Sequence, residues 1–213
     1  MSIKNYLFPE IQKIYYSPIN GEIQLIKFAG DLQLNVDGLL ESGAVMARVW
    51  RDGLTHLLPK TFIPKSILML GFAGGSAAKM LADRYPGVKI TGVEIDPMMI
   101  QIAKDHFKIG KIPNLEIINQ DAIKFINDCH LPTDNWDLVL ADCFKGFDIP
   151  AEFSDIKLLK KAVSLTDNFL INRLYWDEHI PLTNQFLDEV KKHFSVTTHR
   201  SYSNLVIKLQ KDQ

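Results

Sequence analysis

The sequence predicts an α/β protein with a doubly wound, mainly parallel sheet, a small N-terminal antiparallel β region and a C-terminal antiparallel hairpin. Three observations predict this class. From residue 64 onward, short apolar runs alternate with helical segments, which indicates parallel strands joined by crossover helices. Turn residues divide residues 15–37 into short strands, and Asn20-Gly21 is a strong hairpin signal. Finally, two strand-like runs at 194–199 and 204–209 are separated by only a short link.

These patterns divide the chain into two expected regions, residues 1–60 and residues 61–213. The first region would hold the small β sheet and a linking helix at 44–58, in which Gly53 weakens the helical pattern. In the second region we expect strands at 67–71, 89–94, 115–118, 137–142 and 168–173, with helices near 75–85, 97–107, 121–128, 155–165 and 181–193. Asp96-Pro97 opens one of these helices, because the acid can cap it and proline suits its first turn.

The bulk composition excludes several classes of function. With 24 basic and 25 acidic residues, the chain has no charge excess that would favour nucleic acid or an anionic membrane. The two cysteines are too few for a disulfide framework or a zinc site, and the histidines lack metal-ligand spacing, so we expect no metal. The first residues hold no signal-peptide core, and no apolar run approaches the ~18 residues of a membrane span. We therefore expect a cytoplasmic protein.

The segment 66–96 carries the clearest functional signal. The run Ile67–Leu70 is apolar on both faces, as in a buried parallel strand, and Gly71, Gly74 and Gly75 follow it. Such glycines allow tight turns and let a ligand approach the free N–H groups at the start of the next helix. Glu94 then ends the second strand, where it could accept hydrogen bonds from both hydroxyls of a ribose. This arrangement indicates a cofactor that contains a nucleoside.

Acidic residues also end the next two strands. Asp121 could accept a hydrogen bond from an adenine amino group, with the Ala122 N–H facing a ring nitrogen. Asp142 follows a very apolar strand, so partial desolvation would raise its pKa and suit it to act as a general base. Each feature also has a structural interpretation, since Glu94 and Asp121 could be helix caps and Asp142 could be structural. The convergence of four strand ends in one crevice favours a ligand site.

The motifs also resemble a known family. The order GFAGGS at 71–76, VEID at 93–96, QDA at 120–122 and D-x5-D-I-P from Asp142 is similar to the class I S-adenosylmethionine-dependent transferases. Within them it resembles the spermidine synthase-like (polyamine aminopropyltransferase-like) family. The segment LQLNVDGLLE, at 32–41, resembles the L-x-L-D-G-x-x-Q strand and turn of that family. The resemblance covers about residues 15–209.

The resemblance implies a class I methyltransferase-type sheet and an adenosyl cofactor. The cofactor would be S-adenosylmethionine, or else decarboxylated S-adenosylmethionine or methylthioadenosine. The residues that the resemblance implies around it are Gly71, Gly75, Glu94, Ile95, Asp121, Ala122 and Asp142, with Gly74 in the same turn.

The acceptor half of the family pattern is altered. True aminopropyltransferases carry G-G-G-D-G-G in the first turn, and Gly74 stands in place of the acid that binds the aminopropyl donor. They also carry D-S-x-D-P after the fourth strand, where Lys145 replaces the second acid. A lysine there opposes a dicationic acceptor. The residues that we expect at the acceptor site are Glu41 in place of the family glutamine, Trp50 and Asp52 in place of Y-x-E, Asp148 as a displaced acid, and Tyr175.

We therefore expect methyl transfer to a small-molecule acceptor, with Asp142 as the orienting or general-base group. Aminopropyl transfer is an alternative, in which Asp148, Asp52 or Glu41 would replace the lost acids. A catalytically inactive adenosyl-binding or scaffold protein is another alternative. A nicotinamide-dependent oxidoreductase is disfavoured because the first turn lacks G-x-G-x-x-G spacing. The resemblance also makes a homodimer plausible.

Overall fold

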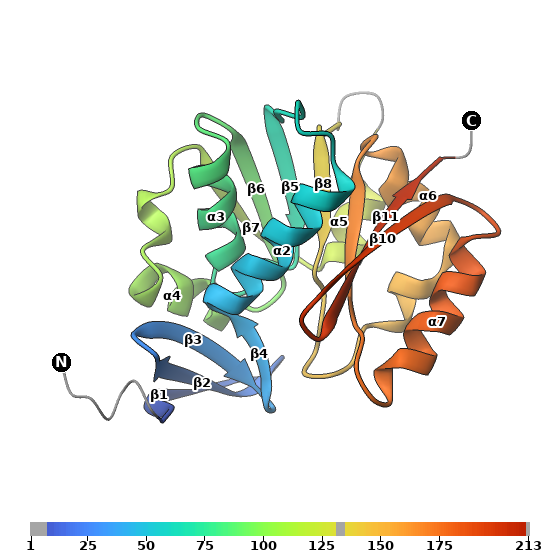
Figure 1. Cartoon of the computed structure of the whole chain (residues 1–213). Coiled ribbons are helices and arrows are strands. Elements are labelled where there is room, and N and C mark those ends of the chain that lie inside the picture. The colour runs from blue at the N-terminus through green and yellow to red at the C-terminus, as the bar shows by residue number, and fades with distance from the viewer. Residues whose placement is uncertain (1–7, 131–134, 212–213) are drawn as a thin grey trace.

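The computed structural model describes residues 8–130 and 135–211, which form two sheets flanked by helices (Figure 1). The large sheet has seven strands in the order β10-β11-β9-β8-β5-β6-β7. Its parallel strands are β5 (Ser66–Leu70), β6 (Lys89–Glu94), β7 (Leu115–Asn119), β8 (Leu138–Ala141) and β9 (Phe169–Leu174). The antiparallel hairpin of β10 (Ser195–Ser201) and β11 (Asn204–Gln210) joins this sheet through β9. The predicted α/β class and the C-terminal hairpin are thus confirmed.

The N-terminal sheet is antiparallel and has four strands in the order β1-β2-β3-β4. They are β1 (Glu10–Ser17), β2 (Gly21–Phe28), β3 (Asp31–Val36) and β4 (Leu39–Ser42). The sheet begins earlier than residue 15 and ends later than residue 37. Because β1 is an exposed edge strand with a bulge between Ile11 and Lys13, no face of it is regularly buried. It therefore shows none of the alternation from which a strand is predicted.

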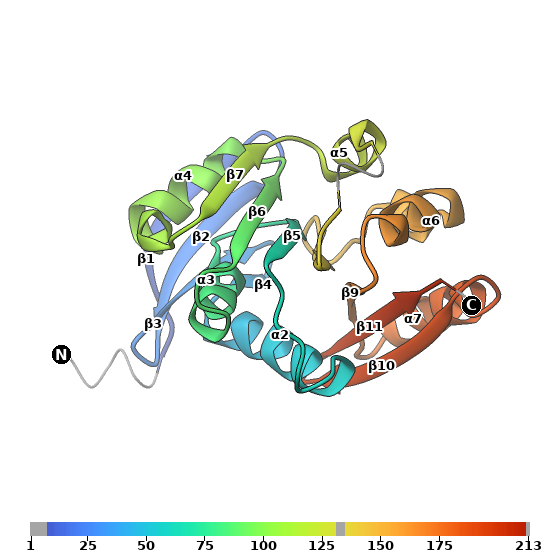
Figure 2. The ribbon, with the colours of Figure 1, turned by 90° about the horizontal axis from the view of Figure 1, so that it is seen from above.

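Helices cover both faces of the large sheet, as Figure 2 shows from above. They are α2 (Ala44–Leu57), α3 (Ser76–Arg84), α4 (Pro97–His106), α5 (Ala122–Asp128), α6 (Ile156–Ser164) and α7 (His179–Val190), with the short 3-10 helices η1 (Ile109–Lys111) and η2 (Ala151–Ser154). The pleat of β5 divides the core between the two faces. Ile67 and Met69 pack with α2 and α3, whereas Leu68 and Leu70 pack with α5, α6 and α7.

Gly53, which weakened the helical pattern, is required by packing. A Cβ atom at this position would lie 2.8 Å from Cγ1 of Val206 in β11. The glycine therefore lets α2 approach the C-terminal hairpin closely. Its helical neighbours Trp50 and Leu54 are fully buried in the same core. The boundary that we expect near residue 60 falls between α2 and β5 and stays a prediction.

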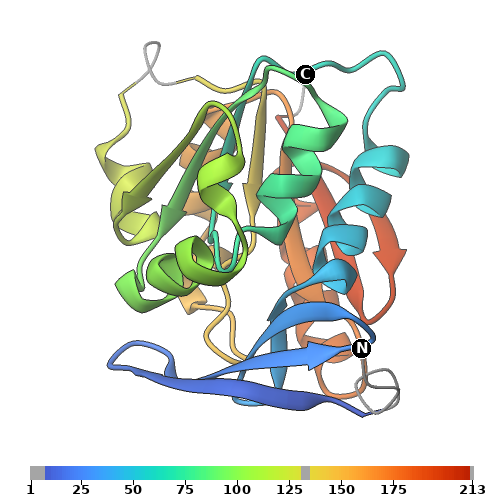
Figure 3. The ribbon, with the colours of Figure 1, turned by 90° about the vertical axis from the view of Figure 1, so that its left-hand side faces the viewer.

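The N-terminal sheet lies against the carboxyl ends of the parallel strands, at the bottom of Figure 3. Hydrogen bonds fix it there. The Nδ2 of Asn20, in the β1–β2 turn, donates to Asp96 Oδ2 over 2.7 Å. Asp96 is fully buried and caps α4, as expected, by accepting from the Met98 N–H. The Oγ atoms of Ser42 and Ser76 lie 2.9 Å apart. The small sheet thus closes the end of the large sheet where ligands of α/β folds collect.

Across residues 8–130 and 135–211, no helix combines the length and apolar character needed to cross a membrane.

Candidate functional site

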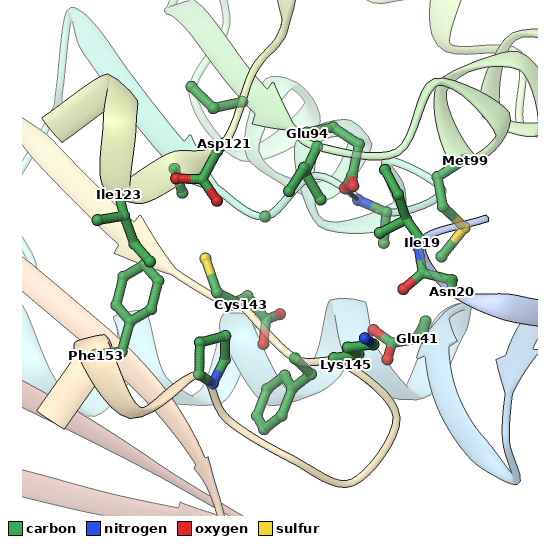
Figure 4. Close-up of a pocket in the computed structure, with 18 residues that line it drawn as sticks. Ile19, Asn20, Glu41, Glu94, Met99, Asp121, Ile123, Cys143, Lys145 and Phe153 are labelled. Carbon is green, nitrogen blue, oxygen red and sulfur yellow. Dashed lines mark hydrogen bonds between the residues drawn. The ribbon is translucent and has the colours of Figure 1, made fainter. Parts of the chain in front are cut away.

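A pocket lies between the carboxyl ends of the parallel strands and the N-terminal sheet (Figure 4). It is lined by Ile19, Asn20, Glu41, Gly71, Ala73, Val93, Glu94, Ile95, Met99, Asp121, Ala122, Ile123, Asp142, Cys143, Phe144, Lys145, Pro150 and Phe153. Four acids from separate segments, Glu41, Glu94, Asp121 and Asp142, are among these residues, and Figure 4 shows apolar side chains between the carboxylates. The strand ends that the sequence singled out therefore meet in one cavity.

Gly71 lets the ends of β5 and β8 approach each other. It has a φ of 86°, in the left-handed region. A Cβ atom there would lie 2.2 Å from the carbonyl oxygen of Asp142. No other residue fits this position without moving the backbone. The glycine thus fixes the first turn of the pocket directly beside Asp142.

Glu94 holds the first turn in place. Its Oε2 accepts from the N–H groups of Phe72 and Ala73, and its Oε1 accepts from the Asp96 N–H. Burial raises its pKa, and the three backbone N–H donors oppose that rise. A carboxylate has about four acceptor positions, so one remains for a ligand in this arrangement. Glu94 is therefore a support of the turn as well as a candidate ribose ligand.

Asp121 and its neighbours form the next part of the wall. The Oδ1 of Asp121 accepts from the Lys124 N–H over 2.8 Å and caps α5. The helix-cap interpretation of Asp121 is thus observed, while the same side chain also lines the pocket. Ile95 and Met99 supply apolar surface, and Ile95 is 44% exposed. An exposed apolar residue beside a carboxylate suits the flat face and polar edge of a nucleobase.

Both carboxylate oxygens of Asp142 are held by side-chain donors. Its Oδ2 accepts from Trp50 Nε1 over 2.8 Å, and its Oδ1 accepts from Asn172 Nδ2 over 2.9 Å. The Oδ1 of Asn172 in turn accepts from Asn204 Nδ2, which fixes its amide orientation. Burial raises the pKa of Asp142, against the opposing effect of its two donors. The carboxylate is therefore oriented, and each oxygen keeps an acceptor position.

Glu41 faces the same pocket from β4. Burial, and then the charges of Asp142 and Glu94, raise the pKa of Glu41 to about 8. Its carboxyl group is therefore largely protonated at neutral pH, and it can donate as well as accept a hydrogen bond. A neutral Glu41 side chain resembles the glutamine of the L-x-L-D-G-x-x-Q motif, which stands at the same position.

Cys143 and Lys145, which follow Asp142 in the sequence, also line the pocket. Burial raises the pKa of the Cys143 thiol well above its ordinary value, so the thiol is protonated and is a poor nucleophile. Lys145 contributes the single basic side chain among the residues that line the pocket in the described part of the chain. The backbones of Lys145 and Asp148 pair with each other and close a tight loop.

Four residues expected at the acceptor site do not line this pocket. Trp50 is fully buried behind Asp142, to which its indole N–H donates. Asp52 lies on the same helix but accepts from Ser201 Oγ in β10. Asp148 follows the tight loop to a second cavity, beside α7. The hydroxyl of Tyr175 donates to Asn184 on α7. Of the five expected acceptor residues, Glu41 alone lies in the pocket wall.

Two of the three glycines also lie behind the pocket wall. Gly75 caps α3 with a φ of 75°, and a Cβ atom there would lie 2.7 Å from Phe72 and Ile109 side chains. Gly74 packs under the N-terminal sheet. Their role in the structure is to allow close packing of the first turn.

Comparisons with known proteins agree with this architecture. A family described as "Methyltransferase domain" matches residues 67–162. The chain is 28% identical to an eEF1A lysine and N-terminal methyltransferase homolog of Drosophila melanogaster, over 64% of this chain and 21% of that protein. It is 33% identical to a polyamine aminopropyltransferase of Vibrio vulnificus, over 48% of this chain and 34% of that protein. The chain therefore matches only about a fifth to a third of the length of these relatives.

Solved structures show the same fold. A probable spermidine synthase from Corynebacterium glutamicum superposes with a TM-score of 0.73 at 17% identity, over 94% of this chain and 80% of that chain. The chain therefore has the class I methyltransferase fold that this structure shares. Human methyltransferase-like protein 13, solved in complex with SAH, superposes with a TM-score of 0.67 at 21% identity, over 79% of this chain and 83% of that chain.

In this chain, the first turn has no room for an acid at position 74. A Cβ atom on Gly74 would lie 2.8 Å from Ser42 Oγ and 2.9 Å from Leu34 Cδ1. The N-terminal sheet thus fills the space that an aspartate side chain would need. Because position 74 is a glycine and not an acid, β3 and β4 can approach the first turn closely.

Sequence reasoning missed several residues that line the pocket or support it. Asn20 was recognised as a hairpin residue, yet the turn folds over the pocket. Met99 follows the Asp96 cap by one helical turn and could have been found from that spacing. Asn172, which orients Asp142, gave no signal because it lies inside a buried strand and belongs to no motif. Phe153 enters from η2, which was not predicted.

Proposed function

We propose that this chain is an S-adenosylmethionine-dependent methyltransferase that acts on a small acceptor. One observation carries the proposal: the oriented carboxylate of Asp142 faces the same pocket as Glu94, Asp121 and the exposed Ile95. The related methyltransferase and aminopropyltransferase sequences support an adenosyl-type transferase.

The residues of the pocket fit an adenosyl group. Glu94 keeps one acceptor position for a ribose hydroxyl, and Asp121 Oδ2 is available for an exocyclic amine. Ile95 and Met99 offer apolar surface for the base. The absence of a Cβ atom on Gly71 leaves the first turn open to close approach by the ligand. When bound, S-adenosylmethionine would supply a methyl group made electrophilic by its sulfonium.

The protein would contribute orientation and proton transfer. Trp50 and Asn172 hold both oxygens of Asp142, so the carboxylate would bind an acceptor N–H or O–H in a fixed direction. The raised pKa of Asp142 makes it a stronger base than an exposed carboxylate, and it would take the proton that the acceptor loses. The carboxylates around the pocket would also attract a cationic donor.

Methyl transfer is preferred to aminopropyl transfer because of position 74. The aminopropyl donor carries a free amine. In true aminopropyltransferases, the acid of the G-G-G-D-G-G turn binds this amine. Here Ser42 and Leu34 occupy the space for that acid. Lys145 also adds a positive charge to the pocket wall, where a polyamine would require a negative one.

Aminopropyl transfer is the second candidate, and the acidic cluster favours it. Glu41, Glu94 and Asp142 face one pocket, and burial, followed by repulsion from the other two acids, raises the pKa of Glu41. A cationic amine would relieve this repulsion on binding. A protein that binds an adenosyl compound without catalysing a reaction is the third candidate. Measurable turnover with any acceptor would exclude it.

The first experiment is calorimetric titration with S-adenosylmethionine, decarboxylated S-adenosylmethionine, methylthioadenosine and NAD. We expect S-adenosylmethionine to bind about tenfold or more tightly than its decarboxylated form, a difference of about 1.4 kcal/mol. Release of S-adenosylhomocysteine in a screen of amine and hydroxyl acceptors would then identify the reaction. Asp142→Asn should bind the cofactor normally and lose turnover. Preference for the decarboxylated form would overturn the proposal in favour of aminopropyl transfer.

A further inference from the structure

A second cavity, of about 450 Å³, lies beside α7 and η2 and is separate in its lining residues from the pocket at the strand ends. Its walls are formed by Phe147, Asp148, Ile149, Ser154, Arg173, Leu174, His179, Leu182, Thr183, Gln185, Phe186 and Glu189. This volume lies in the range of small-molecule sites. None of the roles proposed above uses this cavity.

Arg173, at the end of β9, is the unusual residue of this cavity. It is only 6% exposed, yet no carboxylate of the described residues lies within ion-pair distance of it. Its Nη2 donates to the Phe153 carbonyl over 3.1 Å and to Ser154 Oγ over 2.9 Å. Its Nε is buried and has no hydrogen-bond partner. The guanidinium is therefore a buried charge with neutral partners and a free donor.

The packing around Arg173 holds the guanidinium in place. Its Cζ lies 3.7 Å from the centre of the Phe186 ring, which fixes the plane of the group. Burial lowers the pKa of Arg173 to about 10, so it still carries a positive charge at neutral pH. An isolated buried charge costs several kcal/mol unless it gains a partner. A rigid, charged fork with a free N–H matches the two oxygens of a carboxylate or a phosphate.

A second buried nitrogen without a hydrogen-bond partner belongs to a residue that lines the same cavity. The Nε2 of His179, the first residue of α7, is buried and makes no hydrogen bond. The Oε1 of Glu178 lies 3.9 Å from this nitrogen, beyond hydrogen-bond distance. The acids that line the cavity are Asp148, which is exposed, and Glu189, which pairs with Lys192 and His193. Neither acid neutralises Arg173.

We propose that the cavity between η2 and α7 binds a small anion, a carboxylate or a phosphate group, through Arg173 and with His179 as a second polar contact. The site is independent of the proposed methyl transfer, and it shares only the segment 147–154 with the neighbourhood of the first pocket. A ligand at Arg173 would pair with the free Nε and lower the cost of the buried charge.

The test is calorimetric titration of the whole protein with inorganic phosphate and, separately, with succinate, at constant ionic strength set with sodium chloride. We expect saturable binding of at least one of the two anions, and their relative affinity distinguishes phosphate from carboxylate chemistry. Arg173→Gln should weaken the binding by about tenfold or more, since a charge-assisted hydrogen bond is lost. The exposed Arg84 provides a matched control, and Arg84→Gln should leave the affinity within twofold.

The stability of the ligand-free variants separates a binding role from a structural one. If Arg173 awaits an anion, Arg173→Gln should keep or raise the melting temperature without ligand and lose the rise that the anion causes. If the arginine is only a brace for η2, the variant should melt earlier with the anion effect unchanged. Should Arg173→Gln not fold, Arg173→Lys keeps the charge, lacks the fork and should still bind the anion more weakly.

Two results would overturn the proposal. One is heat equal to the chloride control with both anions in the wild-type protein. The other is anion binding that S-adenosylhomocysteine abolishes and Arg173→Gln does not change, since that would assign the anion to the first pocket. Failure of the chain to bind any adenosyl compound would leave the Arg173 result intact, so the two proposals fail separately.

Discussion

The indole N–H of Trp50 donates to the Oδ2 of Asp142 over 2.8 Å, although 92 positions separate the two residues in the sequence. Trp50 is fully buried in the core between α2 and the large sheet. The same packing that anchors α2 therefore aims the carboxylate at the pocket. Trp50 is a positioning residue, because it contacts Asp142 and does not line the pocket.

Trp50→Phe should separate binding from catalysis. The variant keeps most of the apolar volume and removes the N–H donor, so Asp142 loses a bond of about 1.5–3 kcal/mol. We expect turnover to fall by about 10- to 100-fold and cofactor affinity to change little. Loss of a donor to the charged form raises the pKa of Asp142, so the acidic limb of the pH–rate profile should move to higher pH. Trp136→Phe, outside the pocket, is the control, and equal losses in both variants would argue against positioning.

Gly74→Ala should destabilise the fold even though it adds a single methyl group. The new Cβ atom would meet Ser42 Oγ and Leu34 Cδ1, and overpacking of this kind costs about 1–3 kcal/mol. Gly110→Ala is the matched control, because nothing lies within 4 Å of its Cβ position. Urea denaturation of both variants measures the difference. Gly74→Asp should be at least as unstable as Gly74→Ala, and it should not gain affinity for decarboxylated S-adenosylmethionine. A gain in affinity would show that the N-terminal sheet moves to make room for the acid, which would contradict this prediction.

Glu41 should make stability depend on pH. Its pKa is raised from an ordinary 4.5 to about 8, so the folded protein holds this proton more tightly than the unfolded chain does. Its stabilising contribution is full below pH 4.5 and is lost as the pH rises toward and through 8. Glu41→Gln removes this dependence, so the melting temperature of the variant relative to the wild type should increase between pH 5 and pH 8.5. The exposed Glu116→Gln serves as the control, and parallel curves for the wild type and Glu41→Gln would contradict the raised pKa.

Gly53→Ala should lower stability against the expectation from helix propensity. Alanine favours a helix interior by about 1 kcal/mol over glycine, yet its Cβ atom would lie 2.8 Å from Val206. We expect a net loss of about 1–2 kcal/mol, because the clash exceeds the gain in propensity. A double-mutant cycle with Val206→Ala tests the cause, since the smaller partner should recover part of the loss. Strict additivity of the two changes would place the effect elsewhere.

The order of strands and helices after residue 64 was predicted from the sequence because each element carries its own local signal. Buried parallel strands are continuously apolar, and Asp96-Pro97 marks a helix start. The four strand ends that converge on the pocket followed from the same pattern, since parallel strands place their carboxyl ends at one edge. The start of β1 and the 3-10 helices were missed, because exposed or very short elements leave no periodic pattern.

The sequence alone determined the fold class, the glycine turn, and the strand ends that carry Glu94, Asp121 and Asp142. Tertiary structure alone decided which oxygens meet which donors. It places Trp50 and Asn172 on Asp142, turns Asp148 toward another cavity, and packs Ser42 where an acid at position 74 would lie. The reason is physical. Periodicity and turn chemistry act over a few neighbouring residues, whereas these contacts depend on how segments far apart in the chain pack against one another.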